Sequence, residues 1–198
     1  GIRMIYTVTL NPSIDFIVHV DHLAIGALNK MTQDFKLPGG KGINVSRILK
    51  RINVDSTALG FVGGFTGTFI SDWLTEETID HQFTSVTDDT RINIKLKSGE
   101  ETEINGLGPA ISESEIADLK AKFSQLKPDD IVILSGSKPA GLAADFYDDL
   151  IDLGHNAGAD FVIDTTGAEL FAAFTAQPLL IKPTNHEWAE LYRTSFSR

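Results

Sequence analysis

Short, continuously apolar runs alternate with longer amphipathic segments through the second half of the chain. The apolar runs predict buried strands, and the amphipathic segments predict helices. The predicted strands are DIVILSGS at 130–137, DFVID at 160–164 and LLIKP at 179–183, and the predicted helices cover 142–157, 168–175 and a helix start at 185–192. Because strands that alternate with helices form parallel sheets covered on both faces, this pattern predicts an α/β fold.

The first half of the chain has the same rhythm. Four apolar residues spaced i, i+3, i+4 and i+7 predict a helix with one apolar stripe after the glycine-rich stretch LPGGKG. They are Val45, Ile48, Leu49 and Ile52. Ser112 begins a Ser-x-x-Glu capping box ahead of another helix. The remaining predicted elements are strands at 5–10 and 55–64 and helices at 67–77 and 112–126.

Two segments, 16–37 and 90–105, interrupt this rhythm. The first holds two short apolar runs around a glycine-containing connection, which is typical of an antiparallel strand pair. In the second, residues 90–97 alternate strictly between polar and apolar side chains and end in the turn Ser98-Gly99, which predicts a hairpin. We expect the two segments to form a small antiparallel sheet over one edge of the main sheet.

Composition narrows the classes of function. A chain of 198 residues with 42% hydrophobic and 22% charged residues is typical of one globular domain. The formal net charge of −10 disfavours nucleic acid and anionic membranes as partners. There is no cysteine, which excludes disulfides and thiolate metal sites and fits a cytoplasmic protein. The five histidines lack metal-binding spacing, and no Gly-x-Ser-x-Gly elbow is present.

The glycine-rich stretch PGGKG at 38–42 is the first candidate site. A Walker A loop requires Ser or Thr after its lysine, but Lys41 is followed by Gly42, and the third glycine of the dinucleotide fingerprint is also missing. The glycines still permit close approach of a ligand to the backbone, and the free N–H groups of a helix start favour an anion. Lys41 adds a charge and Asn44 a neutral donor. The alternative is a plain glycine turn with a solvated lysine.

Polar residues also follow several predicted strands at the edge where open α/β sheets bind ligands. Asp15 lies in the turn LNPSID just beyond the first strand, Ser135 begins the Ser-Gly-Ser that ends another, and Asp164 ends a third. Each alone is consistent with an ordinary turn. If the 90–105 hairpin covers this edge, Arg91 faces the same cleft. Carboxylates suit sugar hydroxyls while Lys and Arg suit phosphate, so the combination favours a sugar phosphate.

Seven motifs carry a resemblance to the ribokinase-like (PfkB) sugar kinases over residues 4 to about 193. In the family's order they are TLNPSID, PGGKGINVSRIL, GFVGG, TRINIKL, LSGSKPAG, IDTTG and IKPTNHEWAEL. The first two are similar to the branch that phosphorylates hexose phosphates, namely the 1-phosphofructokinases and tagatose-6-phosphate kinases, and TRINIKLKSGEETEING is closer to the former. The resemblance implies a three-layer α/β/α domain over 4–198 with a mostly parallel sheet and a β-lid formed by 16–37 and 90–105, through which such kinases commonly form homodimers.

The resemblance also implies which residues bind the sugar phosphate. Arg91 and Lys41 match the basic residues that hold its phosphate, with Ser137 nearby, and Lys30 is a weaker candidate for the same role. The residues expected around the sugar are Asp15, Gly39, Gly40, Asn44 and, on the lid strand, Asn93.

The cofactors implied by the resemblance are ATP and Mg²⁺. Lys182 and Glu187 match cofactor-binding positions, and Glu187 would act on the metal indirectly, through water. The family's Asn-x-x-Glu pattern is altered, because Thr184 stands where the asparagine is usual and Asn185 follows one place along. A second departure is Lys138, which stands where the family has an apolar residue and is expected either to tune the pocket or to point to solvent.

The family's Gly-Ala-Gly-Asp motif, whose aspartate is the general base, belongs to the last third of these kinases and would lie beyond Arg198. We therefore assign no catalytic residue and expect a C-terminally incomplete domain with no kinase turnover alone. The intact parent is expected to phosphorylate fructose 1-phosphate to fructose 1,6-bisphosphate with ATP. The alternatives are a tagatose-6-phosphate kinase, a non-catalytic sugar-phosphate-binding module and a plain α/β scaffold protein.

Overall fold

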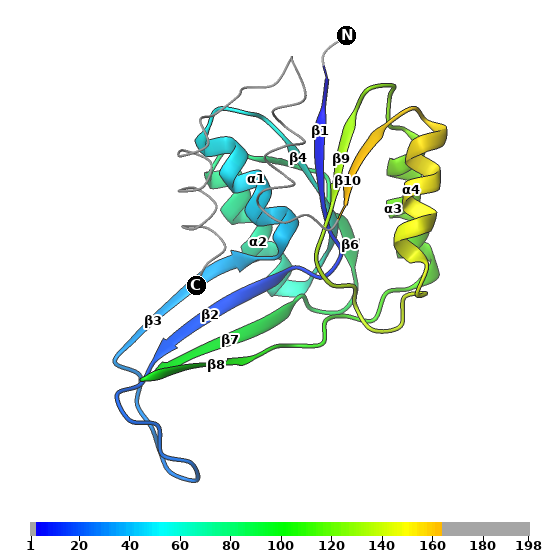
Figure 1. Cartoon of the computed structure of the whole chain (residues 1–198). Helices are drawn as coiled ribbons and strands as arrows, with labels where there is room; N and C mark the ends of the chain where they lie inside the picture. The colour runs from blue at the N-terminus through cyan, green and yellow to red at the C-terminus, as the bar shows by residue number, and fades with distance from the viewer. Residues whose placement is uncertain (1–2, 164–198) are drawn as a thin grey trace.

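A parallel sheet forms the centre of the protein, as the alternating pattern predicts (Figure 1). The structure is a computed structural model that describes residues 3–163, so the elements predicted at 168–192, together with Lys182, Thr184, Asn185 and Glu187, lie outside the described residues. The strand order is β10-β9-β1-β4-β5, with β6 also paired to β4, and every pairing is parallel. The strands are β1 (Ile5–Thr9), β4 (Thr57–Gly63), β5 (Asp80–His81), β6 (Thr84–Val86), β9 (Ile131–Leu134) and β10 (Asp160–Ile163).

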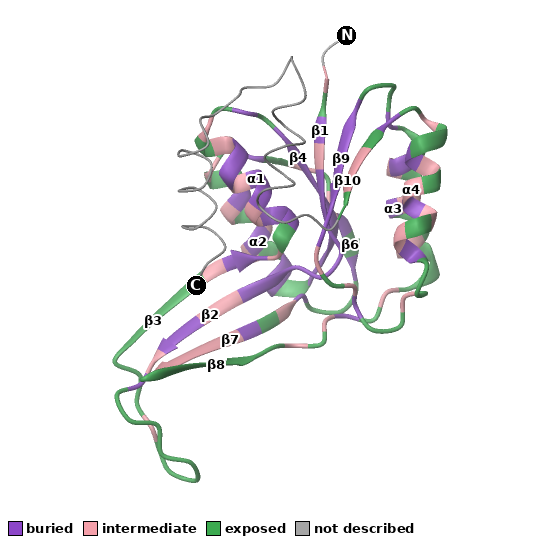
Figure 2. Cartoon of the chain, viewed as in Figure 1, coloured by how far each residue is buried: buried purple, intermediate pink, exposed green. Residues whose placement is uncertain are grey.

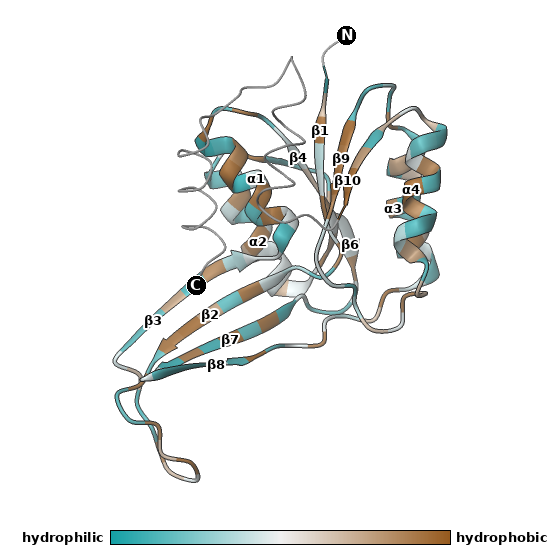
Figure 3. Cartoon of the chain, in the orientation of Figure 1, coloured by the Kyte–Doolittle hydropathy of each residue, from teal (hydrophilic) through white to brown (hydrophobic). Residues whose placement is uncertain are grey.

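Helices cover both faces of this sheet and complete the three predicted layers. Helices α1 (Lys41–Arg51) and α2 (Gly64–Glu76) lie on one face, and α3 (Glu113–Ser124) and α4 (Phe146–Asn156) lie on the other (Figure 1). The strands between them are mostly buried and rich in hydrophobic residues (Figures 2 and 3). Helix α3 has the predicted capping box at Ser112 and Glu115. Helix α4 begins four residues later than predicted, because residues 140–145 form turns.

Phe61 lies at the centre of the core between the sheet and helices α3 and α4. Its side chain is fully buried, and its ring centroid lies 6.4 Å from that of Phe146. Phe123 of α3 and Leu150 of α4 belong to the same cluster, with Val8 of β1. Continuous burial of β4 follows from its position inside the sheet with helices on both faces, and it explains why TALGFVG has no polar alternation.

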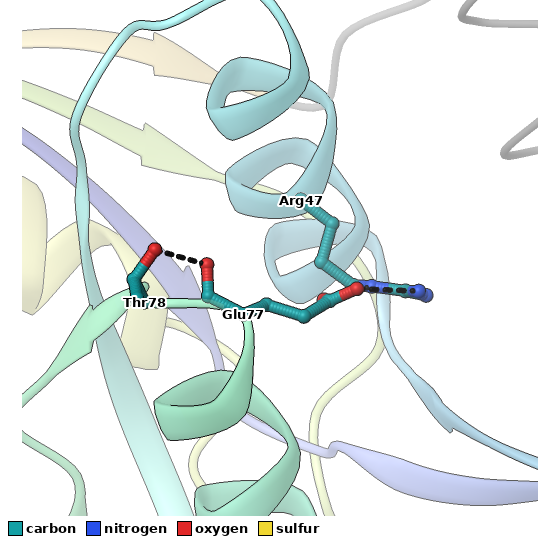
Figure 4. A network of polar contacts seen from close by, with 3 residues as sticks. All are labelled: Arg47, Glu77 and Thr78. Carbon is teal, nitrogen blue, oxygen red and sulfur yellow. Dashed lines mark hydrogen bonds and ion pairs between the residues drawn. The ribbon is translucent and has the colours of Figure 1, made fainter.

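Arg47 ties the two helices on the other face together. Its Nε donates to Oε1 of Glu77 at 2.7 Å and its Nη2 donates to Oε2 at 3.2 Å, as Figure 4 shows. The guanidinium carbon lies 5.6 Å from the centroid of the Trp73 ring. Thr78, next along the chain, donates its hydroxyl to the carbonyl oxygen of Glu77 at 2.6 Å (Figure 4). These contacts hold α1 against the C-terminal end of α2, and they thereby help to position the glycine-rich stretch at the start of α1.

A second sheet, the lid, projects from one end of the molecule (Figure 1). Its strands are β2 (Ser13–His19), β3 (Gln33–Gly39), β7 (Arg91–Ser98) and β8 (Glu100–Ile104), in the order β3-β2-β7-β8. The two predicted hairpins are both antiparallel. The expectation of a purely antiparallel lid is wrong, however, because the hairpins join through the parallel pair β2–β7. Both strands start at the base of the lid and run outward, so they can pair only in parallel.

The position of Asp15 is a further correction. The sequence predicted a turn at this residue, but Asp15 lies within strand β2, which begins at Ser13. Only Leu10 to Pro12 separate the end of β1 from this strand. The backbone is extended there because Asp15 is paired on one side with Leu37 and on the other with Asn93. These partners are distant in sequence, and local turn residues do not reveal them.

Candidate functional site

The carboxyl edge of the main sheet, the start of α1 and the base of the lid meet at one place. Strands β1 and β9 end together there, since Val8 lies beside Leu134 in their parallel register. Helix α1 begins close against this edge: a Cβ built on Gly136 would lie 3.9 Å from the Cβ of Lys41. The lid strands β2 and β7 begin at the same edge. The sequence therefore folds its glycine-rich stretch and its lid residues around a common point.

Two glycines at this point have no room for a side chain. A Cβ on Gly39 would lie 2.5 Å from Oδ2 of Asp15, and one on Gly40 would lie 2.5 Å from Cγ2 of Thr9. Gly40 also has a φ of 119°, which L side chains rarely adopt. Gly40 is the N-cap of α1 and offers no side-chain cap, and the first turn has no acidic residue. The N–H groups at the start of α1 are therefore suited to an oxygen-rich or anionic ligand.

The Asp15 carboxylate is at the centre of a polar cluster on the lid. Its Oδ1 accepts a hydrogen bond from Ser13 Oγ at 2.7 Å and one from Asn93 Nδ2 at 3.4 Å. Its Oδ2 lies 3.6 Å from Nζ of Lys95. Asn93 is buried, and its Oδ1 accepts from the backbone N–H of Gly106 at 3.0 Å. The structure thus brings together the predicted residues Asp15, Gly39 and Asn93.

Arg91 lies beside this cluster, two residues before Asn93 on β7 and paired with Ser13 at the base of the lid. Its Nε donates to the carbonyl oxygen of Asn11 at 3.1 Å, and its Nη1 donates to that of Gly106 at 3.2 Å. Burial lowers the pKa of the Arg91 guanidinium from its usual value, and the negative charge of Asp15 opposes that shift. Nη2 has no hydrogen-bond partner within residues 3–163 and can bind an anion.

The other predicted residues lie at different distances from the cluster. Lys41 and Ser137 are exposed at the sheet edge, and Asn44 is half-buried in the first turn of α1. Lys138 instead donates its Nζ to the carbonyl oxygens of Ala143 and Ala144, at 3.2 and 3.0 Å, so it stabilises its own loop. Lys30 lies in the β2–β3 loop, at the end of the lid opposite Gly39.

Sequence reasoning missed two hydroxyl-bearing residues and one lysine of this region, namely Thr9, Ser13 and Lys95. It named Ser135 as a residue of the ligand edge but did not predict that its hydroxyl lacks a partner within residues 3–163. Thr9 and Ser135 come directly after Val8 and Leu134, which are paired in the register of β1 and β9. Both have buried hydroxyls without a partner within residues 3–163. Ser13 and Lys95 both approach Asp15. Lys95 lies on the same face of the alternating strand as Arg91 and Asn93, and this shared face is the only sequence signal that could have identified it. Nothing local marks the hydroxyls, because their lack of a partner depends on the packing of α1.

Replacing Thr9 by valine is expected to raise the free energy of unfolding by about 1 kcal/mol, because valine keeps the shape and removes a buried hydroxyl that has no partner among residues 3–163. Thr7→Val is the matched control on the same strand. Thr7 Oγ1 shares a hydrogen bond with Ser46 Oγ at 2.7 Å, so Thr7→Val is expected to lower the free energy of unfolding by about 1 kcal/mol. Urea denaturation measures both, and equal destabilisation by the two variants would contradict the prediction.

The described part of the chain offers neither a metal cluster nor a membrane span. Within residues 3–163, no three His, Asp or Glu side chains come together in a group that could hold a metal ion. No helix in the same range has both the length and the hydropathy needed to cross a lipid bilayer. The residues matched to the nucleotide and the metal, Lys182 and Glu187, lie outside it.

Comparison with known proteins gives matches along almost the whole chain. Residues 8–196 match the model of the pfkB family carbohydrate kinases. The chain is 50% identical over 194 residues to 1-phosphofructokinase of Bacillus subtilis, covering 98% of this chain and 64% of that protein. It is 38% identical over 189 residues to D-tagatose-1-phosphate kinase of Bacillus licheniformis, covering 96% of this chain and 62% of that protein. The chain therefore spans less than two thirds of the length of these relatives.

The fold also matches solved structures. The tetrameric inhibited form of phosphofructokinase-2 from Escherichia coli superposes with a TM-score of 0.77 at 24% identity, and the match covers 98% of this chain and 69% of that one. At this identity the likeness supports the three-layer fold and its lid, and no more.

Proposed function

Because the chain belongs to the pfkB family of carbohydrate kinases, we propose that it forms the sugar-phosphate site and the lid of a 1-phosphofructokinase. The reaction would transfer the γ-phosphoryl group of ATP to the 6-hydroxyl of fructose 1-phosphate. The observation that carries this proposal is the cluster around Asp15. It combines a carboxylate, an amide and two cations above a glycine turn that has no room for a side chain.

Each part of the cluster has a role in this proposal. Asp15 Oδ2 would accept a hydrogen bond from a sugar hydroxyl, and Gly39, which has no side chain, lets the Asp15 carboxylate pack directly against the glycine turn. Arg91, fixed by two carbonyl oxygens, would bind the substrate phosphate, with Lys41 adding a second charge. Holding the sugar in one orientation presents a single hydroxyl for transfer, which is the main contribution that a protein makes to phosphoryl transfer.

ATP would supply the phosphoryl group and Mg²⁺ would neutralise its charge. Within this chain, Lys182 and Glu187 are the proposed cofactor-binding residues, the latter through water. The general base of the family belongs to the Gly-Ala-Gly-Asp motif, which this sequence does not contain.

The choice of substrate rests on the relatives. The 1-phosphofructokinase of Bacillus subtilis is 50% identical to this chain, and the D-tagatose-1-phosphate kinase of Bacillus licheniformis is 38% identical. We therefore favour fructose 1-phosphate and keep a tagatose phosphate as the second candidate. Both named substrates carry the phosphate at C1, so a tagatose 1-phosphate fits the comparison better than the tagatose 6-phosphate that the motifs suggested.

We also propose that the lid pairs with a second copy of this chain. Large apolar side chains of the lid strands are exposed, and covering them would remove apolar surface from water. They are Phe35 at 46%, Ile92 at 43% and Ile104 at 56% exposure. A homodimer would cover this surface.

The proposed substrates, ATP and a sugar phosphate, also suit an enzyme of the cytoplasm, which is the compartment that we propose.

The test separates binding from turnover. The 198-residue chain is expected to bind fructose 1-phosphate in a calorimetric titration, more tightly than tagatose 1-phosphate or tagatose 6-phosphate. It is expected to form no fructose 1,6-bisphosphate from ATP, whereas a protein that joins this chain to a Gly-Ala-Gly-Asp segment should form it. Turnover by the chain alone at the rate of an ordinary kinase would refute the division of roles, and absence of sugar-phosphate binding would refute the proposed site.

A further inference from the structure

Lys95 adopts a position that its strand pairing does not require. In the β7–β8 hairpin its direct partner is Glu103, and an opposite charge directly across a strand pair is the usual ion-pair partner. Lys95 instead reaches across the other side of its strand, where its Nζ lies 3.6 Å from Asp15 Oδ2. The Lys95 side chain is 20% exposed and that of Asp15 is 17% exposed. The ion pair therefore lies in a partly desolvated part of the lid.

The two oxygens of Asp15 have different surroundings. Oδ1 accepts hydrogen bonds from Ser13 and Asn93. Oδ2 has Lys95 as its charged neighbour, with Nζ at 3.6 Å. The carboxylate is thus held from both sides, and the whole group packs against Gly39 of the glycine turn. A carboxylate without Lys95 could rotate about its terminal bond, because torsions to sp² groups are broad.

We propose that Lys95 is a positioning residue, which fixes the Asp15 carboxylate so that Oδ2 meets a sugar hydroxyl. This inference rests on the proposed function, because it presumes that Asp15 binds the sugar. Lys95 acts through Asp15 and not on the phosphate of the substrate. The phosphate falls to Arg91, which lies four residues earlier on the same face of β7 and is anchored by carbonyl oxygens at 3.1 and 3.2 Å.

A positioning role and a direct contact with the substrate predict different results in a double-mutant cycle. Lys95→Met keeps most of the aliphatic side chain and removes the charge. We expect it to weaken fructose 1-phosphate binding roughly five- to tenfold, as for the loss of one partner of a partly buried charged pair. In the Asp15→Asn background the same change should have less than about a twofold effect, because the interaction it removes is already absent.

Two further variants control for charge and for folding. Lys95→Arg retains a cation within reach of Asp15 and is expected to recover at least half of the lost affinity in logarithmic terms. Lys97→Met changes a lysine two residues along the same face, whose strand partner is Glu101, and should leave binding within about twofold of the unchanged protein. Thermal unfolding of every variant checks that the fold is retained.

Chemical-shift titration of the 198-residue chain with fructose 1-phosphate is the measurement, since it also reports weak dissociation constants. A smaller effect of Lys95→Met in the Asp15→Asn background, with recovery by arginine, supports the inference. An equal effect in both backgrounds would mean that Lys95 contacts the substrate itself, and no effect in either would mean that it has no role; both outcomes overturn the inference while the proposed function stands. If the unchanged chain does not bind the sugar phosphate, the proposed function fails and the inference fails with it.

Discussion

Asp15→Ala is expected to weaken the binding of fructose 1-phosphate about a hundredfold or more, which corresponds to roughly 3 kcal/mol. The variant removes the only carboxylate of the polar cluster. It also leaves the buried Asn93 amide and the Lys95 ammonium without the acceptor that they face. Calorimetric titration of the chain with the sugar phosphate measures the loss. The expected effect is larger than that of Lys95→Met, because the group proposed to contact the sugar is itself removed.

Asp34→Ala is the matched control for this prediction. Asp34 lies on the lid strand β3, where its carboxylate pairs with Lys36 at 3.0 Å on the surface, and such exposed pairs contribute little. Its removal is expected to leave both the binding and the fold unchanged. If Asp15→Ala bound the sugar phosphate as well as Asp34→Ala does, Asp15 could not be part of the sugar site.

Phe61→Ala is expected to lower the free energy of unfolding by about 3–5 kcal/mol, the usual range for a fully buried phenylalanine. The variant would leave a cavity among Phe123, Phe146 and Leu150, where α3 and α4 pack on the sheet. Denaturation in guanidinium chloride measures the change. A loss of this size is a large fraction of the stability of an ordinary domain, so partial unfolding at physiological temperature is an expected consequence.

Phe65→Ala gives the matched comparison, because Phe65 is only four residues away and is 73% exposed on α2. Its replacement is expected to change the free energy of unfolding by less than about 0.5 kcal/mol. Similar losses from both variants would contradict the packing of β4 described above, since they would place the two side chains in equally buried surroundings.

The α/β rhythm of the fold could be predicted because the central strands β1, β4 and β9 are buried between helices on both faces of the sheet. Runs such as IVIL at 131–134 have no polar alternation for that reason. The lid hairpins were also predictable, since each pairs two strands that follow one another in sequence, β2 with β3 across the loop 20–32 and β7 with β8 across a tight turn at Gly99. Their parallel union was not, because β2 and β7 are more than seventy residues apart and neither carries a mark of the other.

The residues of the candidate site likewise fall into those that could be identified from the sequence and those that could not. The glycine turn and Arg91 could be identified from residue type, because close approach and positive charge are properties of single residues. The proposed role of Lys95 could not be identified in this way, since the sequence of the hairpin is equally consistent with an ion pair between Lys95 and Glu103. The unpartnered hydroxyls of Thr9 and Ser135 were equally invisible, because a missing partner is a property of the packed structure.

The parallel pairing of β2 with β7 joins the two lid hairpins into one continuous sheet. Asp15 is bonded through the backbone to the strand of Gly39 on one side and to that of Asn93 on the other. Any movement of the lid as a unit would therefore carry Asp15 and Asn93 together and keep the distance between them, whereas Gly39 would stay close to Lys41, from which only Gly40 separates it in sequence. In the proposed function, the contacts of Asp15 with the sugar ring and the position of that ring relative to the sheet edge would then depend on different parts of the lid. Substitutions at the base of the lid would then be expected to change how far the bound sugar lies from the sheet edge without changing its proposed contacts with Asp15.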